Sequence, residues 1–164
     1  MDVDKLYREH GKVLFGYLVA QTGDYAAAQD LFQETFLRIQ RYGSSYSGAG
    51  SEKSYLFQAA RNIFRDWLKR RKTENPEMLE TVPVNGDPKV KVERESLRES
   101  VAACVHGLPA EQREVLVLRE YENLKVRQIA EHLSIPEGTV KTRLRRGLQT
   151  LKSRLHSAGI LERL

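Results

Sequence analysis

The sequence predicts an all-α protein made of two small helical domains that a linker joins. Apolar residues recur every three or four positions through most of the 164 residues, and no useful length alternates as a strand would. Between the helical segments, residues 73–92 contain three of the five prolines and an Asn-Gly-Asp turn sequence, without an apolar period. The predicted domains are therefore residues 1–72 and residues 93–164.

The N-terminal domain is predicted to be a bundle of three helices, at about residues 4–21, 25–42 and 54–72. Asp24 is placed to cap the second helix, and Gly43-Ser44-Ser45 is placed to close it. The apolar and small side chains at helical spacing form the expected core: Leu6, Val13, Leu14, Tyr17, Leu18, Ala28, Leu31, Phe32, Thr35, Ile39, Leu56, Ala60, Ile63, Phe64 and Trp67.

The second helix carries an apolar residue, Leu37, on its polar side. Around Leu37, opposite the expected core, lie Asp30, Gln33, Glu34 and Arg41. An exposed leucine inside a polar face is typical of a protein contact. Single exposed apolar residues are also common without any such role, so both interpretations stay open from these residues alone.

The third helix carries a cationic face opposite its expected core. The outward positions are Gln58, Arg61, Asn62, Arg65, Lys69 and Lys72. The loop before this helix, residues 43–53, is rich in Ser and Gly and contains Tyr46, which suits stacking on an unpaired base. A plain solvated face explains the same residues equally well, so this segment alone does not decide the function.

The C-terminal domain is predicted to contain four helices, at about residues 93–106, 110–121, 126–133 and 136–156. Pro109 and Pro136 are expected in the first turn of the second and fourth of these, where a missing N–H is tolerated. The last helix is expected to turn one apolar stripe inward: Val140, Leu144, Leu148, Leu151 and Leu155.

The last two predicted helices form a helix-turn-helix pattern. A short helix and a tight turn precede a helix whose residues 138–156 include six Lys or Arg and no acid. The start of such a second helix enters the major groove, where Arg and Lys donate to guanine and Thr contacts base edges. A solvated basic helix is the alternative, against which the Pro-Glu-Gly-Thr-Val entry argues. The residues placed to contact DNA are Thr139, Lys141, Thr142, Arg143 and Arg146.

Charge and composition narrow the class of protein. Residues 1–72 carry 12 basic and 8 acidic side chains, residues 73–95 carry 3 and 6, and residues 96–164 carry 12 and 8, which is typical of two modules that approach a polyanion. The sequence has neither an apolar run that could cross a membrane nor a signal-peptide pattern, so we expect a cytoplasmic protein without membrane insertion. The single cysteine, Cys104, forms no internal disulfide and is expected to be a small buried residue.

Several segments resemble the extracytoplasmic-function group of bacterial RNA polymerase sigma factors. Residues 30–38, DLFQETFLR, are similar to the helix of sigma region 2 that docks on the polymerase clamp. Residues 55–68, YLFQAARNIFRDWL, resemble the promoter-melting helix of that region. Residues 108–116, Ile129-Ala130 and residues 138–144 resemble sigma region 4. The order and spacing of these motifs on either side of the linker make the resemblance specific.

The resemblance implies a promoter-recognition subunit that has no catalytic residues, no cofactor and no metal. Its partners would be promoter DNA, an anti-sigma factor and core RNA polymerase, at the clamp of the beta-prime subunit and the flap of the beta subunit. Polymerase contacts would fall on Asp30, Gln33, Glu34 and Leu37. Contacts to the minus-ten element would fall on Tyr46, Gly48, Arg61, Asn62, Arg65 and Lys69. Contacts to the minus-thirty-five element would fall on Arg119, Thr139, Lys141, Thr142, Arg143 and Arg146.

Three positions depart from the usual family pattern. Tyr55 stands where Trp is usual, and Val126-Arg127-Gln128 replaces a commoner acidic pair, so the promoter sequence does not follow from the resemblance. Gly147 stands where Ala is usual, and it is expected to weaken the last helix by roughly 0.5–1 kcal/mol relative to Ala.

Two other classes of protein are the alternatives. A two-component-type regulator shares the Gly-Thr-Val-Lys entry, but residues 1–72 lack the alternating strands and acidic pocket of a receiver domain. An enzyme acting on nucleic acid would need a catalytic or metal-binding cluster. The four histidines are scattered, no Gly-rich phosphate loop occurs, and Cys104 and His106 are only two ligands.

Overall fold

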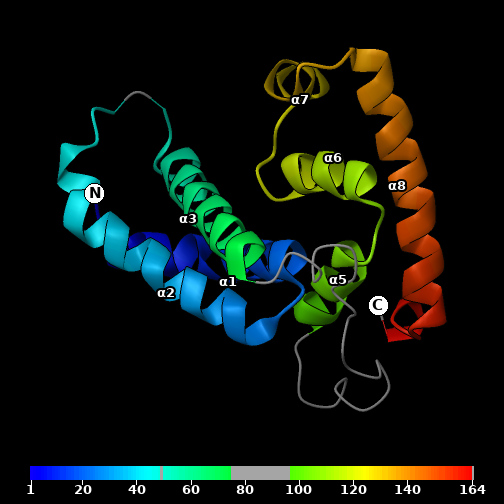
Figure 1. Ribbon diagram of the computed structural model, residues 1–164, viewed down its shortest axis with the longest axis horizontal. Helices are drawn as coiled ribbons and strands as arrows, with labels where there is room; N and C mark the ends of the chain where they lie inside the picture. The colour runs from blue at the N-terminus through cyan, green and yellow to red at the C-terminus, as the bar shows by residue number, and fades with distance from the viewer. Residues whose placement is uncertain (49, 75–96, 164) are drawn as a thin grey trace. The chain divides into compact units, whose positions relative to one another are not determined.

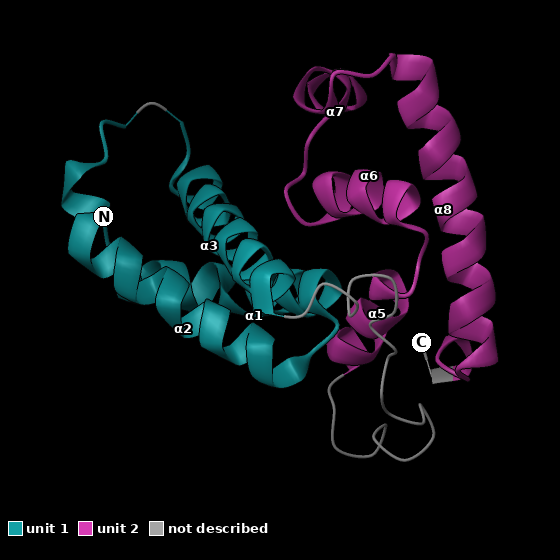
Figure 2. Cartoon of the chain, viewed as in Figure 1, with its two compact units in different colours: residues 1–85 teal, residues 86–164 magenta. Residues whose placement is uncertain are grey.

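The protein, seen in a computed structural model, consists of helices joined by turns and short loops over the residues that the structure describes, which are 1–48, 50–74 and 97–163 (Figure 1). The chain divides into two compact units, residues 1–85 and 86–164, which are coloured separately in Figure 2. The predicted all-α class with two helical domains is confirmed. Of the predicted linker, only Thr73 and Glu74 lie among the described residues, and both extend the third helix.

Unit 1 contains three helices: α1 (Val3–Thr22), α2 (Tyr25–Tyr42) and α3 (Glu52–Glu74). The Asp24 side chain accepts a hydrogen bond from the Ala27 N–H at 3.2 Å, so the predicted cap of α2 is confirmed. A short 3-10 turn, η1 (Gly43–Ser45), closes α2 as expected. Ser51 caps α3 by accepting from the Ser54 N–H at 3.1 Å.

The core of unit 1 lies where the three helices meet. The residues buried there include most of the predicted core together with Val19, Ala20 and Phe57, which the spacing did not single out. The phenol ring of Tyr17 and the ring of Phe57 meet edge to face at 5.4 Å between centroids. The face of α3 that enters the core is therefore centred nearer Phe57 than the sequence predicted.

Four predicted core residues of unit 1 are only half-buried: Val13, Phe32, Phe64 and Trp67. The prediction was wrong for these residues because each lies at the edge of a helix contact. Phe32 joins an aromatic row along the seam between α1 and α2, with ring contacts to Tyr7, Phe15 and Phe36. Trp67 stacks with Phe64 near the end of α3, and Arg71 covers its ring at 4.9 Å.

Unit 2 contains α5 (Leu97–His106), α6 (Ala110–Glu120), α7 (Val126–Leu133), α8 (Glu137–Ser157) and a final 3-10 turn, η3 (Leu161–Arg163). The first helix of this unit was predicted from residue 93, and residues 93–96 lie outside the described residues. The other three helices end within one residue of their predicted limits.

Pro109 and Pro136 precede α6 and α8 and do not lie in their first turns, contrary to the prediction. Both have extended backbone, with ψ of 139° and 148°, which is the conformation of a cap residue. Their carbonyl groups accept the first hydrogen bonds of the two helices, from the Gln112 N–H at 3.0 Å and the Thr139 N–H at 3.1 Å. Each proline is therefore the N-cap residue, one position before the first residue of its helix.

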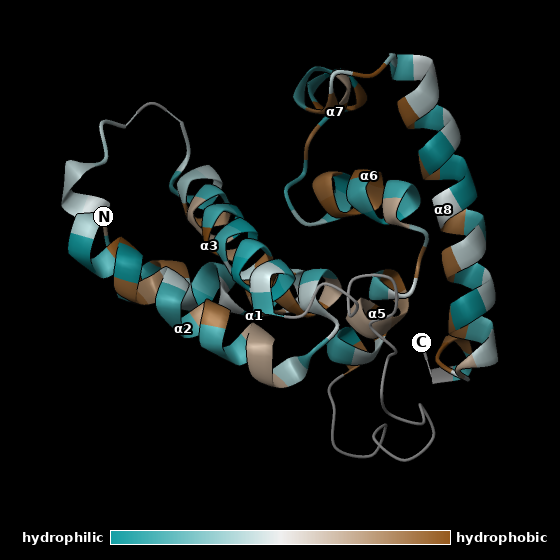
Figure 3. Cartoon of the chain, in the orientation of Figure 1, coloured by the Kyte–Doolittle hydropathy of each residue, from teal (hydrophilic) through white to brown (hydrophobic). Residues whose placement is uncertain are grey.

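The core of unit 2 is built mainly by α6, α7 and α8. Val115, Leu118, Ile129, Ala130 and Val140 are buried together. Leu124, Val126, Leu133, Ile135 and Leu144 pack around them. Hydrophobic and hydrophilic residues share every helix of this unit in Figure 3, as amphipathic helices around a common core require.

Gly147 lies in the contact between α6 and α8. A Cβ at this position would lie 2.8 Å from Leu116 Cδ1 and 3.3 Å from Gln112 Cβ, so any side chain here requires the buried Leu116 to shift. The buried side of α8 passes through Gly147, and Leu148 is 51% exposed, which corrects its predicted place in the core stripe. The expected gain from alanine treated the helix in isolation and omitted this neighbour.

Gly147→Val is expected to destabilise unit 2 by about 1–3 kcal/mol, because the added side chain overpacks the contact with Leu116. Urea unfolding followed by far-ultraviolet circular dichroism should show part of the helical signal lost at lower urea. Gly138→Ala is the control, since nothing lies within 4 Å of a Cβ there. Fluorescence of Trp67, the single tryptophan, reports on unit 1 and should keep its midpoint. An unchanged circular-dichroism midpoint would contradict the steric argument.

Candidate nucleic-acid interface

The turn between α7 and α8 has the geometry of a helix-turn-helix motif. Ser134 follows α7 in the left-handed conformation, with φ of 54°. Its N–H donates to the Glu131 carbonyl, and the Ile135 N–H donates to the Ala130 carbonyl at 3.1 Å, which is the paired closure of a Schellman motif. Because Ile135 also packs on the core, the direction in which α8 leaves the turn is set by both hydrogen bonds and burial.

The first turns of α8 bring most of the predicted DNA-contacting residues together. Lys141 and Arg146 are exposed, while Thr139 and Thr142 are partly exposed. The Thr142 hydroxyl donates to the Gly138 carbonyl at 3.0 Å, which leaves its oxygen able to accept and its methyl group able to contact a base. This side of α8 is opposite Val140 and Gly147, so it is free of the core of unit 2.

Arg143 has a partner that the sequence did not indicate. Its Nη2 lies 3.2 Å from Oε1 of Glu111, which stands in the first turn of α6. The Arg143 side chain is 24% exposed and the Glu111 side chain 74%. The predicted base-contacting residue is therefore joined to a second helix at the edge of the candidate interface.

Arg119 is not part of the α8 group of predicted DNA-contacting residues. It lies at the end of α6, and its Nη1 donates to the Leu124 carbonyl at 3.2 Å. This bond ties down the connection between α6 and α7, in which Asn123 has a positive φ of 58°. Arg119 thus supports the loop before the helix-turn-helix motif.

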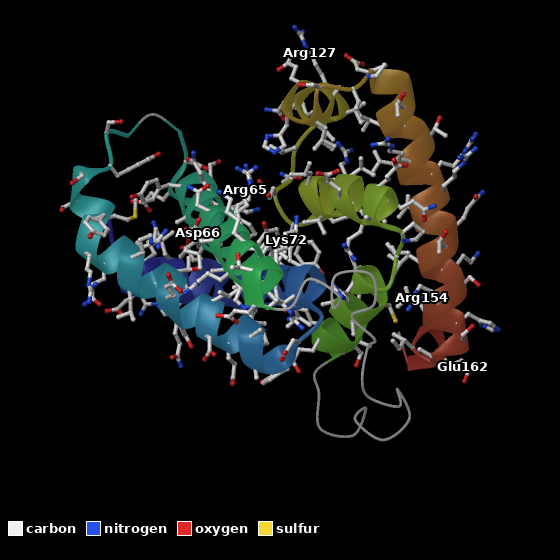
Figure 4. All side chains as sticks on the ribbon, in the orientation of Figure 1. Arg65, Asp66, Lys72, Arg127, Arg154 and Glu162 are labelled. Carbon is white, nitrogen blue, oxygen red and sulfur yellow. The ribbon has the colours of Figure 1, made fainter. Side chains whose placement is uncertain are left out.

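On α7, Arg127 points away from the helix into solvent in Figure 4, where it is labelled. Its side chain is 80% exposed and pairs with Glu131 at 3.1 Å, one turn further along α7. This pair replaces the acidic residues usual in the family with a locally neutral surface.

The second cationic surface lies on α3. Asn62, Arg65 and Lys69 are exposed, and Arg61 is partly exposed. Figure 4 labels Arg65 and Lys72 along this helix, together with Asp66. Leu56, Ala60 and Ile63 are buried on the other side, so the predicted division of α3 into core and cationic faces agrees with the structure.

The loop before α3 is closed on itself by Tyr46. The Tyr46 hydroxyl donates to the Gly50 carbonyl, and its ring lies 4.8 Å from the ring of Tyr55, centroid to centroid. Gly48 and Gly50 have φ of 76° and 127°, which side chains rarely adopt. The sequence indicated Tyr55 only as a departure from the family pattern. In the structure its ring packs against Tyr46 of this loop.

The predicted protein-contact residues lie together on α2. Leu37 is 55% exposed, and Asp30 and Gln33 are exposed on the same side. Glu34 is partly covered and pairs with Arg38 at 3.2 Å. We call Asp30, Gln33, Glu34 and Leu37 the α2 face. It lies opposite the buried residues Ala28, Leu31, Thr35 and Ile39.

Cys104 is only partly buried, where full burial was expected. Burial raises the pKa of the Cys104 thiol, and the nearby Arg154 guanidinium partly opposes this shift. The Arg154 guanidinium lies so close to Gly107 that a Cβ there would clash with it. Among the described residues, no three His, Cys, Asp or Glu side chains gather as metal ligands, and none of the described helices is both long and apolar enough to cross a membrane.

Comparison with known proteins shows what the two units are. The family model of Sigma-70 region 2 matches residues 6–74, and that of Sigma-70 region 4 matches residues 98–151. ECF RNA polymerase sigma factor SigL of Mycobacterium tuberculosis is 33% identical over 160 residues, which cover 94% of this chain and 89% of SigL. SigM of Bacillus subtilis is 30% identical over 165 residues, covering 98% of each chain.

Solved structures show the same fold. The sigma factor RpoE of Bartonella quintana, in complex with the anti-sigma factor NepR, has a TM-score of 0.64 and 20% identity, over 93% of this chain and 95% of RpoE. CnrH, in complex with the cytosolic domain of CnrY, has a TM-score of 0.56 and 19% identity, over 94% and 88% of the two chains. The sequence similarity extends across both units, and the protein therefore belongs to the extracytoplasmic-function (ECF) family of RNA polymerase sigma factors.

Proposed function

We propose that this sigma factor recognises promoters with two separate surfaces and binds core RNA polymerase with a third. The first turns of α8 read the minus-thirty-five element. The cationic face of α3 and the loop around Tyr46 bind the minus-ten element. The α2 face docks on the clamp of the beta-prime subunit, and unit 2 meets the flap of the beta subunit. The protein acts in the cytoplasm, without a catalytic role of its own.

The observation that carries this proposal is the presentation of α8. A closed turn positions the helix, its buried side passes through Val140 and Gly147, and Thr142 and Arg146 stand on the opposite side. The motif that presents Arg and Thr to base edges in this way is a sequence reader, because each base pair has a distinct pattern of donors and acceptors in the major groove.

The surface proposed for the minus-ten element combines positive charge on α3 with aromatic rings in the loop before it. Arg65 and Lys69 supply positive charge on α3, which suits the phosphates of a separated strand. Tyr46 and Tyr55 supply two adjacent aromatic rings at the start of the same helix. A base that leaves the duplex needs such stacking partners, so the loop and α3 together suit one unpaired strand.

The α2 face suits a protein partner. Binding of a partner would bury the exposed leucine as an apolar centre within a rim of amide and acidic groups. Many protein interfaces have such an energetic centre. Its net negative character also makes it a poor surface for DNA.

We also propose that an anti-sigma factor holds the free protein by covering the α2 face, the cationic faces or both. The structure of RpoE with the anti-sigma factor NepR supports this part of the proposal by likeness of fold. Such a partner would block polymerase by occupying the surface that the polymerase needs.

Leu37→Asp combined with Gln33→Ala is expected to abolish binding to core polymerase while the helical circular-dichroism signal stays intact. Truncating a buried anchor at an interface centre commonly costs 2 kcal/mol or more, about thirtyfold in affinity. Pull-down with core polymerase measures the loss, and Lys12→Ala on the exposed surface of α1 is the control. Wild-type affinity of the double variant would show that the α2 face is not the docking surface.

Arg146→Ala is expected to reduce transcription and to change the preferred base at one position of the upstream element. Removing a bidentate base contact costs about 1–3 kcal/mol and relaxes preference there, whereas removing a phosphate contact weakens all sequences alike. Run-off transcription across a promoter library randomised in that element measures both effects. Lys152→Ala, further along α8, should stay near wild type. Unchanged base preferences for all alanine variants of Thr139, Lys141, Thr142, Arg143 and Arg146 would remove sequence reading from α8.

Co-expression with the product of the neighbouring gene is expected to give a heterodimer, because an anti-sigma factor covers faces that are exposed in the free chain. Gel filtration of the co-expressed proteins measures this. The Leu37→Asp and Gln33→Ala double variant distinguishes cover of the α2 face from cover of the cationic faces. Elution as a monomer alone would count against an anti-sigma partner from that gene.

A further inference from the structure

Arg143 differs from the other cations near the start of α8. Its side chain is only 24% exposed and pairs with Glu111 of α6 at 3.2 Å. Lys141, Arg145 and Arg146 are exposed, and no acid of the described residues forms an ion pair with any of them. Among the described residues of this group, Arg143 is thus the one cation that already has an acidic partner on a second helix before DNA arrives.

Glu111 is well placed to hold a neighbouring side chain. It stands in the first turn of α6, where the helix dipole favours a carboxylate. The close contact of Gly147 with Leu116 fixes α6 against α8, four residues beyond Arg143 on α8. The acid and the arginine therefore sit on two helices whose separation is set by packing.

The pair contributes little to stability in its own right. The Glu111 side chain is 74% exposed, and water screens ion pairs of this kind. Its consequence is instead geometric. A guanidinium carries five N–H donors in a rigid plane, so an ion pair at Nη2 with Glu111 favours one placement of the group while other donors remain available.

We propose that Glu111 is a positioning residue for base reading by Arg143, an inference that rests on the proposed function of α8. An arginine that is already confined loses less rotamer freedom when it binds, and its remaining donors reach the same base edge each time. The expected effect of releasing it is a loss of about two- to tenfold in preference for the base that Arg143 contacts.

A purely electrostatic role of Glu111 has a different signature. Removing one negative charge beside a DNA-binding surface strengthens binding to every sequence and leaves base preference unchanged. A measurement of base preference therefore distinguishes a positioning role of Glu111 from an electrostatic one. The overall level of transcription does not distinguish them.

The test is run-off transcription by core polymerase with the full-length protein, across a promoter library randomised in the upstream element. The variants are Glu111→Ala, Glu111→Gln, Arg143→Ala and the combination of Glu111→Ala with Arg143→Ala. Glu114→Gln is the matched control, because it removes the same charge from an exposed position of α6. Circular dichroism checks that each variant is folded.

We expect Glu111→Ala to lower preference at the base position that Arg143→Ala also affects, and the double variant to lose nothing beyond Arg143→Ala. Glu111→Gln should lose less, since its amide oxygen can accept a hydrogen bond from the guanidinium, and Glu114→Gln should leave every preference unchanged. Should Glu111→Ala fail to fold, the comparison of Glu111→Gln with Glu114→Gln decides.

Three results would overturn the proposal: identical preferences in the Glu111 variants and Glu114→Gln, independent losses in the double variant, or no change of preference in Arg143→Ala. None of these touches the wider function, which also rests on Thr142 and Arg146. A library in which the wild-type protein itself shows no preference would instead defeat the reading of DNA by α8.

Discussion

The close approach of α6 and α8 at Gly147 is the constraint on which the proposed DNA-binding side of unit 2 depends. Leu116 occupies the space that a Cβ at Gly147 would need, so the rotation of α8 about its own axis is set by this contact. Val140 is buried on the same side, and the opposite side then holds Thr142 and Arg146. A rotation of α8 by one residue, about 100°, would turn different side chains toward the core and toward solvent.

Unit 1 consists of three helices that each bury one face in a shared core. Tyr17 of α1 and Phe57 of α3 meet in its centre, and Ala28 and Leu31 bring α2 against them. The inward faces of α2 and α3 are buried in the core. Their outward faces differ in the sign of their charge. The α2 face carries two acids and one amide around an exposed leucine, whereas the outward face of α3 is cationic. One small bundle therefore carries the proposed protein-binding and nucleic-acid-binding surfaces on two different helices.

The polar contacts at the edges of these surfaces are local supports. Arg119 holds the loop before α7, Tyr46 closes the loop before α3, and Glu111 holds Arg143. The first two contacts lie within or next to a loop, whereas Glu111 and Arg143 belong to two helices that the core packs together. Binding side chains that are supported in this way reach their partners with less loss of conformational freedom.

The sequence by itself determined the helices and their class, because caps and apolar periodicity are local properties: Asp24 caps α2 as predicted, and α7 has the predicted limits. The family also followed from sequence, since its motifs are contiguous. Only the tertiary structure decided which stripe of α8 is buried, and that Leu148 is exposed, because Leu116 of another helix occupies the space that a side chain at position 147 would need. The tertiary structure also decided the pairing of Arg143 with Glu111. A contact between distant segments depends on how helices pack, which the periodicity of one helix does not contain.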